Sequence, residues 1–357
     1  MRAMGDGLSL DHYRLLGRSG LRVSPLCLGT MTFGETWGAG EAESRRVFDA
    51  FVDRGGNFID TAGYYARGQS EALTGAFART KRQRLVLSTK YSLAVENGDP
   101  NAAGNGRKSL IALVESSLKR LGTDYIDLLY LHVWDDTTPA DEILQGFDDL
   151  IRQGKILYAG ISDTPAWQVA RMQTLAELRA WPRFIGMQVE YNLLQRAAER
   201  ELLPAALAMG IGVLPWSPLG SGVLSGKYAT GATMPAGEEG GRGTLINSVG
   251  RINAGSIAVA DTVQAIADEI GATSAQVAIG WTFNHSAVTA PVIGARTFRQ
   301  LEDNLGALAI SLDQAQLARL DQATAIDLGF PHDFLKGGHI IEGLTAGTKV
   351  AGLSSPA

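Results

Sequence analysis

Short apolar runs alternate with amphipathic stretches along most of the chain. Eight of these runs have the length of a buried strand, and they cover residues 25–29, 57–60, 84–90, 126–132, 156–162, 184–190, 211–217 and 288–294. The segments between them carry apolar residues at helical spacing, as in 109–122, where Gly122 is placed to end the helix. Strands that alternate with helices predict βα units and a parallel sheet.

Eight such units on one chain favour a closed (β/α)8 TIM barrel, an α/β fold, over a doubly wound open sheet, which is the alternative. Residues 13–29 alternate apolar and polar around "GRSG" and predict a β-hairpin before the barrel. Residues 227–253 are rich in glycine and predict a long loop after the seventh strand. We expect one domain over residues 1–357, with the barrel at about 25–325 and a C-terminal tail at 326–357.

Composition narrows the class of protein. The chain has 357 residues, of which 45% are hydrophobic and 19% are charged, as in a packed globular protein. The net charge is −5 and no basic cluster is present, so nucleic acid is not an expected partner. Cys27 is the only cysteine, which excludes an intrachain disulfide and suits a reducing compartment. Because neither a secretory signal pattern nor a long apolar run occurs, we expect no membrane partner and a cytoplasmic location.

Polar side chains and a large aromatic stand at the carboxyl ends of the predicted strands. Strands two to seven end, in order, at Asp60, Lys90, His132, Ser162 with Asp163, Gln188, and Trp216 with Ser217. A single residue of this kind could cap a helix or face solvent. Six neighbouring strand ends that carry such residues predict a functional site, because the carboxyl ends of barrel strands converge.

The stretch "NFIDTAGYYARGQSE", residues 57–71, adds a tyrosine to this set. A free tyrosine has a pKa of about 10 and keeps its proton at neutral pH. A nearby ammonium lowers that pKa, and a buried carboxylate holds the ammonium in place and charged. We therefore expect Asp60 to orient Lys90, and Lys90 to tune Tyr65. Such a proton donor suits carbonyl reduction, in which the oxygen becomes negative.

These residues, in this order, closely resemble the aldo-keto reductase superfamily, and in particular its aryl-alcohol dehydrogenase-like and potassium-channel β-subunit-like branches. The similarity includes "GTMTFG", "NFIDTAGYY", "STKYS", "YIDLLYLH", "MQVEYNLLQR", "PWSPLGSGVLSGKY" and "GARTFRQLEDNLGAL". The resemblance implies a barrel that binds NADP(H) across its mouth. It also implies a catalytic tetrad of Asp60, Tyr65, Lys90 and His132, with Tyr65 as general acid and Tyr64 as a packing neighbour.

The resemblance further implies which residues hold the cofactor. Ser162, Asp163 and Gln188 would hold the nicotinamide carboxamide, and the ring would stack on Trp216. Asparagine is usual where Asp163 stands, and a carboxylate cannot donate a hydrogen bond to the carboxamide oxygen. The other cofactor residues would be Gly29 and Thr30, then Ser217, Leu219, Gly222 and Lys227 along the pyrophosphate, and Gly294, Arg296, Gln300, Asp303 and Asn304 at the adenosine end. The glycines of the pyrophosphate loop are expected to expose backbone N–H groups.

Two classes of function fit the sequence. The first is an NADPH-dependent reductase that converts an aldehyde or ketone to the alcohol, reversibly. A rim of Trp37, Tyr91, Trp134 and Phe330 would suit an aryl aldehyde or a bulky xenobiotic or toxin ketone. The alternative is a regulatory subunit that binds NADP(H) as a sensor and acts through a protein partner. No metal site is expected, because neither HExxH nor a paired-ligand spacing occurs.

Overall fold

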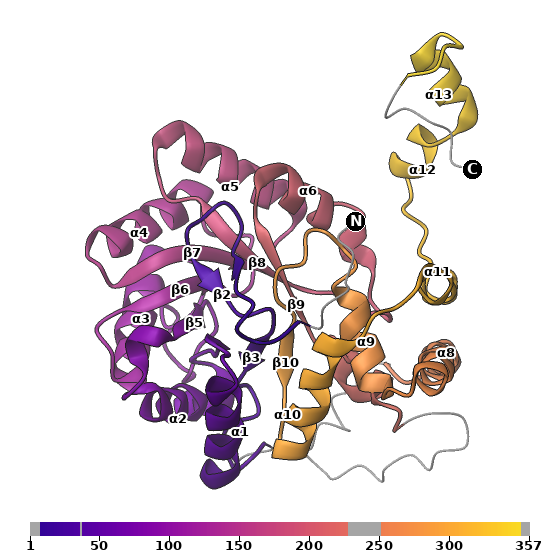
Figure 1. The fold of residues 1–357 in the computed structure, drawn as a ribbon. Coiled ribbons are helices and arrows are strands. Elements are labelled where there is room, and N and C mark those ends of the chain that lie inside the picture. The colour runs from indigo at the N-terminus through magenta and orange to yellow at the C-terminus, as the bar shows by residue number, and fades with distance from the viewer. Residues whose placement is uncertain (1–7, 36–37, 228–250, 351–357) are drawn as a thin grey trace.

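The computed structural model describes residues 8–35, 38–227 and 251–350. Its main sheet contains β3 (Cys27–Gly29), β4 (Phe58–Asp60), β5 (Val86–Tyr91), β6 (Ile126–Leu131), β7 (Ile156–Ser162), β8 (Phe184–Glu190), β9 (Gly212–Trp216) and β10 (Val292–Gly294). All eight strands are parallel, in the order β10-β3-β4-β5-β6-β7-β8-β9 (Figure 1). Val213 of β9 accepts from Thr289 N at 2.8 Å and donates to Ala287 O at 3.0 Å, which brings the two ends of the sheet together. The predicted (β/α)8 barrel is confirmed.

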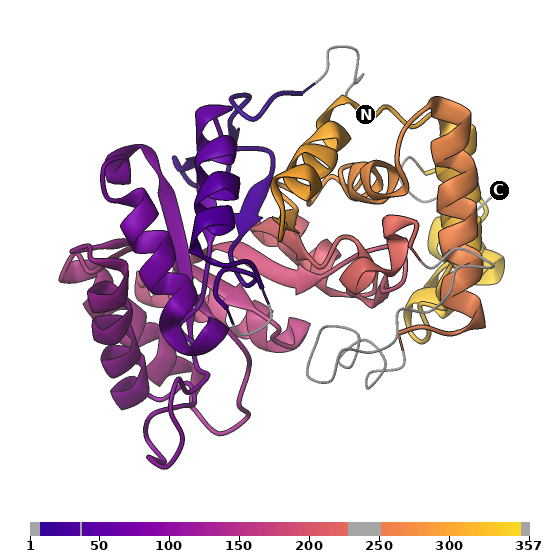
Figure 2. The same ribbon diagram turned by 90° about the horizontal axis from the view of Figure 1, so that it is seen from below.

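Helices surround the sheet on its outer side (Figures 1 and 2). They are α1 (Glu41–Asp53), α2 (Gln69–Ala78), α3 (Arg107–Leu121), α4 (Ala140–Arg152), α5 (Ala166–Arg179), α6 (Leu202–Met209), α8 (Ala254–Ile270), α9 (Ser274–Thr282), α10 (Phe298–Leu305) and α11 (Gln314–Ala323). Two further helices, α12 (His332–Leu335) and α13 (Gly338–Thr345), belong to the C-terminal tail. Short 3-10 helices are η1 (Tyr65–Gly68), η2 (Arg82–Arg84), η3 (Ala197–Glu199), η4 (Gly220–Ser225) and η5 (Gly306–Ala309). Helix α3 ends at Gly122 in the left-handed conformation, as its sequence predicts.

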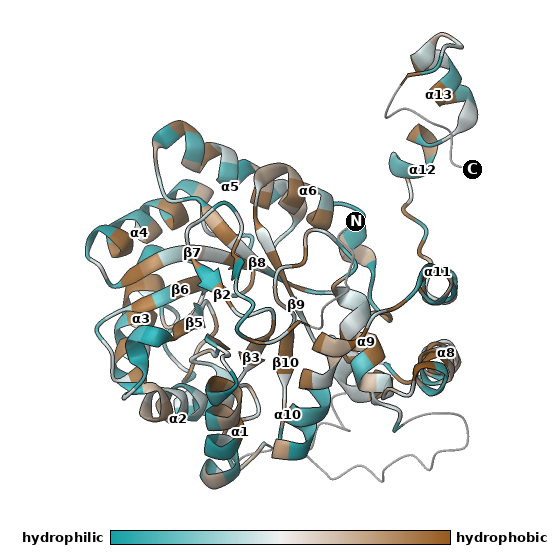
Figure 3. Ribbon diagram, in the orientation of Figure 1, coloured by the Kyte–Doolittle hydropathy of each residue, from teal (hydrophilic) through white to brown (hydrophobic). Residues whose placement is uncertain are grey.

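Helical periodicity explains how these helices attach to the sheet. In α4, the buried residues Ile143, Leu144, Phe147 and Leu150 have the spacing that places them on one face of a helix. Hydrophilic and hydrophobic segments alternate along this helix in Figure 3. Phe147 packs edge-to-face on Phe184 of β8, with ring centroids 5.8 Å apart. The apolar face of the helix therefore covers the outer surface of the barrel.

The N-terminal segment forms the predicted hairpin. Strands β1 (Arg14–Leu15) and β2 (Arg22–Val23) pair antiparallel. Leu16 and Val23 are fully buried and pack with Phe58, Leu128 and Leu214 from the barrel strands. The hairpin therefore closes the barrel at the end opposite the carboxyl ends of the strands.

The C-terminal tail leaves the barrel after α11 and carries α12 and α13 (Figure 1). Arg200 donates to the carbonyl oxygen of Asp327, and His332 Nε2 lies 2.8 Å from Glu201 Oε1, so the start of the tail contacts the α6 side of the barrel. The predicted loop at 227–253 falls outside the described residues except at its two ends. None of the described helices combines the length and the apolar character needed to span a membrane.

Candidate active site

A cavity of about 560 Å³ opens at the carboxyl ends of the barrel strands. Of the residues predicted from the sequence, its wall includes Gly29, Asp60, Tyr65, His132, Ser162, Asp163, Gln188, Trp216, Ser217, Leu219, Gly222, Gly294 and Asn304. They come from seven strands, from the segments that directly follow them and, for Asn304, from helix α10. Parallel strands bring their carboxyl ends to one rim, which is why residues so far apart in the sequence meet here.

Asp60, Lys90 and Tyr65 form a buried hydrogen-bonded chain. Lys90 Nζ donates to Asp60 Oδ2, to the carbonyl oxygen of Thr61 at 3.0 Å, and to Tyr65 Oη at 3.1 Å. Ser88 Oγ donates to the other oxygen of Asp60 at 2.8 Å. Burial disfavours a charge on Lys90, but Asp60 and Tyr65 outweigh it and raise the pKa of Lys90. Lys90 is therefore a fixed ammonium whose three N–H groups are all used.

The direction of the hydrogen bond between Lys90 and Tyr65 leaves the proton of Tyr65 available. An ammonium can only donate, so Tyr65 Oη accepts from Lys90 and its own O–H can point into the cavity. Burial raises the pKa of Tyr65, and Lys90 offsets this rise only in part. Lys90 therefore lowers the pKa of Tyr65 as expected, but burial outweighs this effect and the pKa stays above its usual value. A protonated phenol is nevertheless the form that an acid catalyst needs.

His132 lies beside Tyr65, with the two rings edge-to-face and their centroids 6.0 Å apart. Burial and the charge of Lys90 lower the pKa of His132 to about 3, so the imidazole is neutral. Its Nδ1 is buried and has no hydrogen-bond partner among the described residues. His132 can therefore orient a polar group in the cavity, but it does not carry a charge there.

Ser162, Asp163, Gln188 and Trp216 lie together on the cavity wall. Trp216 Nε1 donates to Asp163 Oδ1 at 3.0 Å. Burial raises the pKa of Asp163 to about 6, although Trp216 and Lys90 oppose the rise. Gln188 is buried, and its Nε2 has no partner among the described residues. An unused amide donor beside a carboxylate acceptor is complementary to a primary amide such as a nicotinamide carboxamide.

The loop from Ser217 to Ser225 differs from its prediction. The N–H groups of Gly220 and Gly222 donate to the carbonyl oxygens of Ser217 and Leu219, and Ser221 N donates to Ser217 Oγ at 2.8 Å. The expectation that the glycines of this loop expose their backbone N–H groups to a pyrophosphate is therefore wrong for Gly220 and Gly222, because the tight turn at Ser221 and Gly222 uses these groups internally. Lys227 is exposed and does not line the cavity.

Arg251 is a cavity residue that the sequence did not reveal. Its Nη1 lies 2.6 Å from Glu190 Oε1 and donates to Ser221 Oγ at 3.1 Å. The guanidinium thus sits between the end of β8 and the loop after β9, on the cavity wall. Arg251 comes at the end of a long glycine-rich stretch, and no strand or motif there indicates that it belongs to the cavity.

The residues predicted for the adenosine end divide into three groups. Asn304 donates to the carbonyl oxygen of Gly294 at 3.1 Å, and both line the cavity. Gln300 accepts from Arg296 N at 2.8 Å and fixes the backbone before α10. Asp303 accepts at 2.7 Å from Thr273, the N-cap residue of the neighbouring helix α9, and so ties α10 to α9. Arg296 is exposed outside the cavity wall.

Thr30 does not reach the cavity. It is fully buried, and its hydroxyl donates to the carbonyl oxygen of Asp60 at 3.1 Å. It therefore supports the backbone of β4, while its neighbours Met31 and Thr32 line the cavity.

The predicted aromatic rim is corrected by the structure. Tyr91 points outward from β5 and packs on Phe147, because side chains alternate along a strand and Lys90 takes the inward position. Phe330 is 84% exposed in the tail. Trp134 packs against the hydrophobic core, donates from Nε1 to Asp136 and does not line the cavity. Trp37 lies outside the described residues. The rim residues that the sequence missed are Met31, Tyr64 and Leu93.

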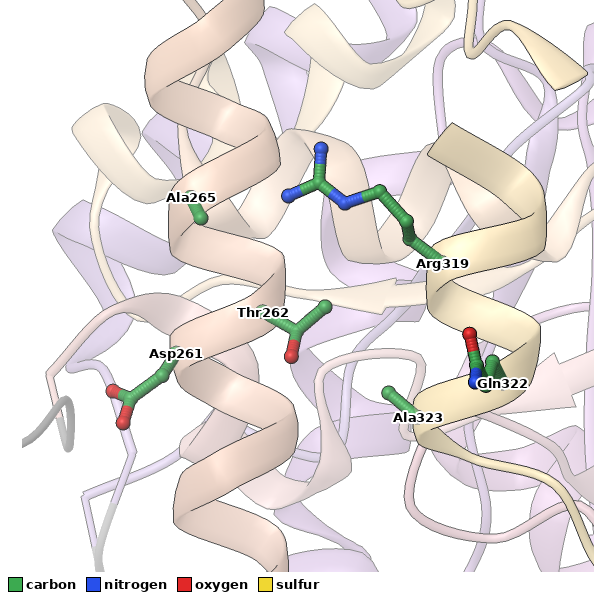
Figure 4. Close-up of a pocket in the computed structure, with 6 residues that line it drawn as sticks. All are labelled: Asp261, Thr262, Ala265, Arg319, Gln322 and Ala323. Carbon is green, nitrogen blue, oxygen red and sulfur yellow. The ribbon is translucent and has the colours of Figure 1, made fainter. Parts of the chain in front are cut away.

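A second hollow, of about 470 Å³, lies on the outer surface between α8 and α11 (Figure 4). Asp261, Thr262, Ala265, Arg319, Gln322 and Ala323 line it. Arg319 pairs with Glu269 of α8 at 2.7 Å, which ties the two helices together. None of the predicted site residues lies there. No group of His, Cys, Asp and Glu side chains that could hold a metal occurs within the part of the chain that the structure describes.

Comparison with known proteins agrees with this geometry. Norsolorinic acid reductase from Aspergillus flavus is 35% identical over 339 residues, which cover 91% of this chain and 84% of the relative. Aryl-alcohol dehydrogenase (NADP+) from Phanerodontia chrysosporium is 36% identical over 90% of this chain and 88% of its own length. The oxidoreductase YrpG from Bacillus subtilis is 37% identical over 87% of this chain and 94% of its own length. The model of the aldo/keto reductase family matches residues 25–325, and the chain therefore belongs to that family.

Proposed function

We propose that this protein is a carbonyl reductase that converts an aryl aldehyde or a bulky aromatic ketone to the alcohol with NADPH, and that oxidises the alcohol in the reverse direction. The observation that carries the proposal is the buried Asp60–Lys90–Tyr65 chain, which ends in a phenol whose proton is free to enter the cavity. Family membership and a relative named for NADP+ support NADP(H) as the cofactor.

The residues present fit this cofactor. The unpartnered Nε2 of Gln188, with Ser162 and Asp163, would hold the carboxamide, and the indole of Trp216 would cover the ring. Arg251 would face the pyrophosphate, because it is the basic side chain on the described part of the cavity wall that can pair with it. When bound, NADPH supplies the hydride.

The residues of the chain supply the proton and the charge stabilisation. Tyr65 donates its proton to the carbonyl oxygen as that oxygen becomes negative. The ammonium of Lys90, held by Asp60, then stabilises the phenolate that remains on Tyr65. Neutral His132 directs the carbonyl oxygen toward Tyr65. In the reverse direction the phenolate accepts the proton of the alcohol.

The rim of the cavity supports an aromatic substrate. Met31, Tyr64 and Leu93 present apolar and aromatic surface beside Trp216. A flat apolar substrate would bury this surface, whereas a small sugar would leave its hydroxyl groups without partners. Two relatives are named for norsolorinic acid and for aryl alcohols, which agrees with this class of substrate.

The test is the decay of NADPH absorbance with a panel of aryl aldehydes, polycyclic aromatic ketones, short aliphatic aldehydes and aldose sugars. We expect turnover of the aromatic carbonyls with kcat/KM at least tenfold above that of the aliphatic ones. Tyr65→Phe is the control for background reduction. Binding of NADPH without turnover of any carbonyl would instead favour a regulatory subunit that senses NADP(H).

A further inference from the structure

The loop that carries Tyr65 has an unusual backbone. Ala66 and Arg67 have φ values of 46° and 53°, and Gly68 follows at 87°. Two consecutive non-glycine residues in the left-handed region are strained, so surrounding contacts must hold the loop in this conformation. Within the described residues the hydroxyl of Tyr65 is bonded only to Lys90, which cannot by itself fix the loop backbone.

Arg120, on helix α3, lies directly against this loop. A Cβ at Gly63 would come within 2.8 Å of Arg120 Nη2, and a Cβ at Gly68 within 2.6 Å of Arg120 Cδ. Glycine at both positions lets the arginine side chain contact the backbone on either side of Tyr65. Arg120 thus occupies the space behind the loop from one end to the other.

A buried carboxylate holds Arg120 in this position. Arg120 Nε donates to Glu71 Oε2 at 2.6 Å, and Glu71 is fully buried in the first turn of α2. The other oxygen of Glu71 accepts from Thr89 Oγ1 at 2.5 Å. Thr89 precedes Lys90 on β5 and points to the opposite face of the strand. Glu71 therefore links the arginine behind Tyr65 to the strand that carries Lys90.

We propose that Arg120 and Glu71 are positioning residues that hold Tyr65 Oη against Lys90 by clamping the loop from Gly63 to Gly68. The proposal rests on the proposed reductase function. Neither residue lines the cavity, so neither contacts substrate or cofactor. Their effect must pass through the placement of Tyr65.

The test compares two ion pairs that both attach to β5. Arg82 pairs with Asp127 at 2.7 Å, and Asp127 accepts from Leu87 N at 3.0 Å, at the end of the strands opposite the cavity. This pair is also largely buried, with 13% and 10% of its side chains exposed. Arg82→Ala therefore controls for the loss of a buried arginine without a change near Tyr65.

We expect Arg120→Ala to lower kcat between about 10- and 100-fold, as a small displacement of a catalytic group does, while KM for the carbonyl and Kd for NADPH change less than threefold. Arg82→Ala should lower the melting temperature but leave kcat within about threefold of wild type. Arg120→Ala leaves Glu71 buried without its cation, so Glu71→Gln/Arg120→Ala serves as a second variant that folds without that charge.

The outcomes separate the two proposals. An unchanged kcat in the folded Glu71→Gln/Arg120→Ala variant would overturn the clamp, as would an equal loss of kcat in Arg82→Ala at the same loss of melting temperature. A wild-type protein that turns over no carbonyl would overturn the reductase function instead. In that case the clamp also fails as a catalytic device, and the Kd for NADPH shows whether the cofactor site is intact.

Discussion

The indole N–H of Trp216 donates a hydrogen bond of 3.0 Å to Oδ1 of Asp163, which joins the ends of β9 and β7 across the cavity wall. Asp163 has a positive φ of 38°, so its backbone as well as its side chain is constrained here. Burial disfavours the carboxylate more than Trp216 and Lys90 favour it, and the pKa of Asp163 rises from 3.8 to about 6.

This raised pKa predicts a pH-dependent effect of Asp163→Asn on stability. Between pH 3.8 and about 6 the folded protein keeps the Asp163 proton while the unfolded chain has lost it, so wild type loses stability as the pH rises through this window. Asparagine cannot ionise, and its oxygen still accepts from Trp216. The melting temperature of Asp163→Asn minus that of wild type should therefore grow as the pH rises from 3.8 to neutral pH, and it should then stay constant. Thermal unfolding of both proteins across that range tests this, and a difference that does not vary with pH would contradict it.

Tyr65→Phe should abolish most of the reductase activity and leave NADPH binding intact. The change removes only the transferable proton, and general acid catalysis contributes about 10²- to 10⁴-fold. Tyr64→Phe is the matched control, because Tyr64 lines the cavity but makes no hydrogen bond through its hydroxyl among the described residues. We expect its kcat to stay within about threefold of wild type. Steady-state rates and fluorescence titrations with NADPH test this prediction. An inactive Tyr64→Phe variant beside an active Tyr65→Phe variant would show that Tyr64 is the proton donor.

His132 should stay neutral over the pH range of any practical assay, because its pKa is lowered to about 3. Its imidazole resonances, assigned by comparison with His132→Gln, should not shift between pH 5 and 8, where an ordinary histidine titrates. His132→Gln should lower kcat by roughly tenfold, the worth of one neutral hydrogen bond, without changing the shape of the pH profile. If the pH profile of wild type showed an ionisation between pH 5 and 8 that is absent from His132→Gln, His132 would be a residue that exchanges protons.

The sequence predicts the barrel and the tetrad for a clear physical reason. Strand length, helical spacing and the polar residue at each strand end are local features, and the barrel topology then brings the strand ends together. Asp60, Lys90 and His132 needed only their positions on strands to be placed. The choice of Tyr65 over Tyr64 rests on the resemblance to the aldo-keto reductases, and the structure brings the hydroxyl of Tyr65 to Lys90.

One error concerns the alternation of side chains along a strand, and the others arise where tertiary contacts decide. The alternation of β5 puts Lys90 inside and Tyr91 outside, which the sequence pattern alone could have shown. The exposed position of Phe330 depends on the path of the tail, for which no local signal exists. The net pKa of Tyr65 depends on how deeply it is buried, and the presence of Lys90 could not reveal that. Arg251 and Arg120 are held by partners more than 25 residues away in the sequence.

We predict that cofactor preference rests on Arg296, which precedes helix α10. The N-terminus of α10 offers little to an anion, because Phe298 N already donates to Glu43 at 2.6 Å and Gln300 N donates to Thr297. Among the described residues, no hydrogen bond or ion pair engages the exposed guanidinium of Arg296. Its charge is therefore available for a 2′-phosphate, and it has to provide most of the discrimination between NADPH and NADH itself.

Arg296→Ala should therefore raise KM for NADPH by about 10- to 100-fold, which corresponds to the roughly 1.5–3 kcal/mol of a hydrogen bond to a charged group. The kcat should hardly change, because this contact is remote from Tyr65 and is the same in the ground state and the transition state. NADH kinetics should not respond, since NADH has no 2′-phosphate.

Arg299→Ala is the control for a general loss of positive charge, because Arg299 is an exposed arginine in the first turn of the same helix. Steady-state kinetics with both cofactors on the three proteins is the test, and either a wild-type preference for NADH or an equal effect of the two substitutions would refute the assignment.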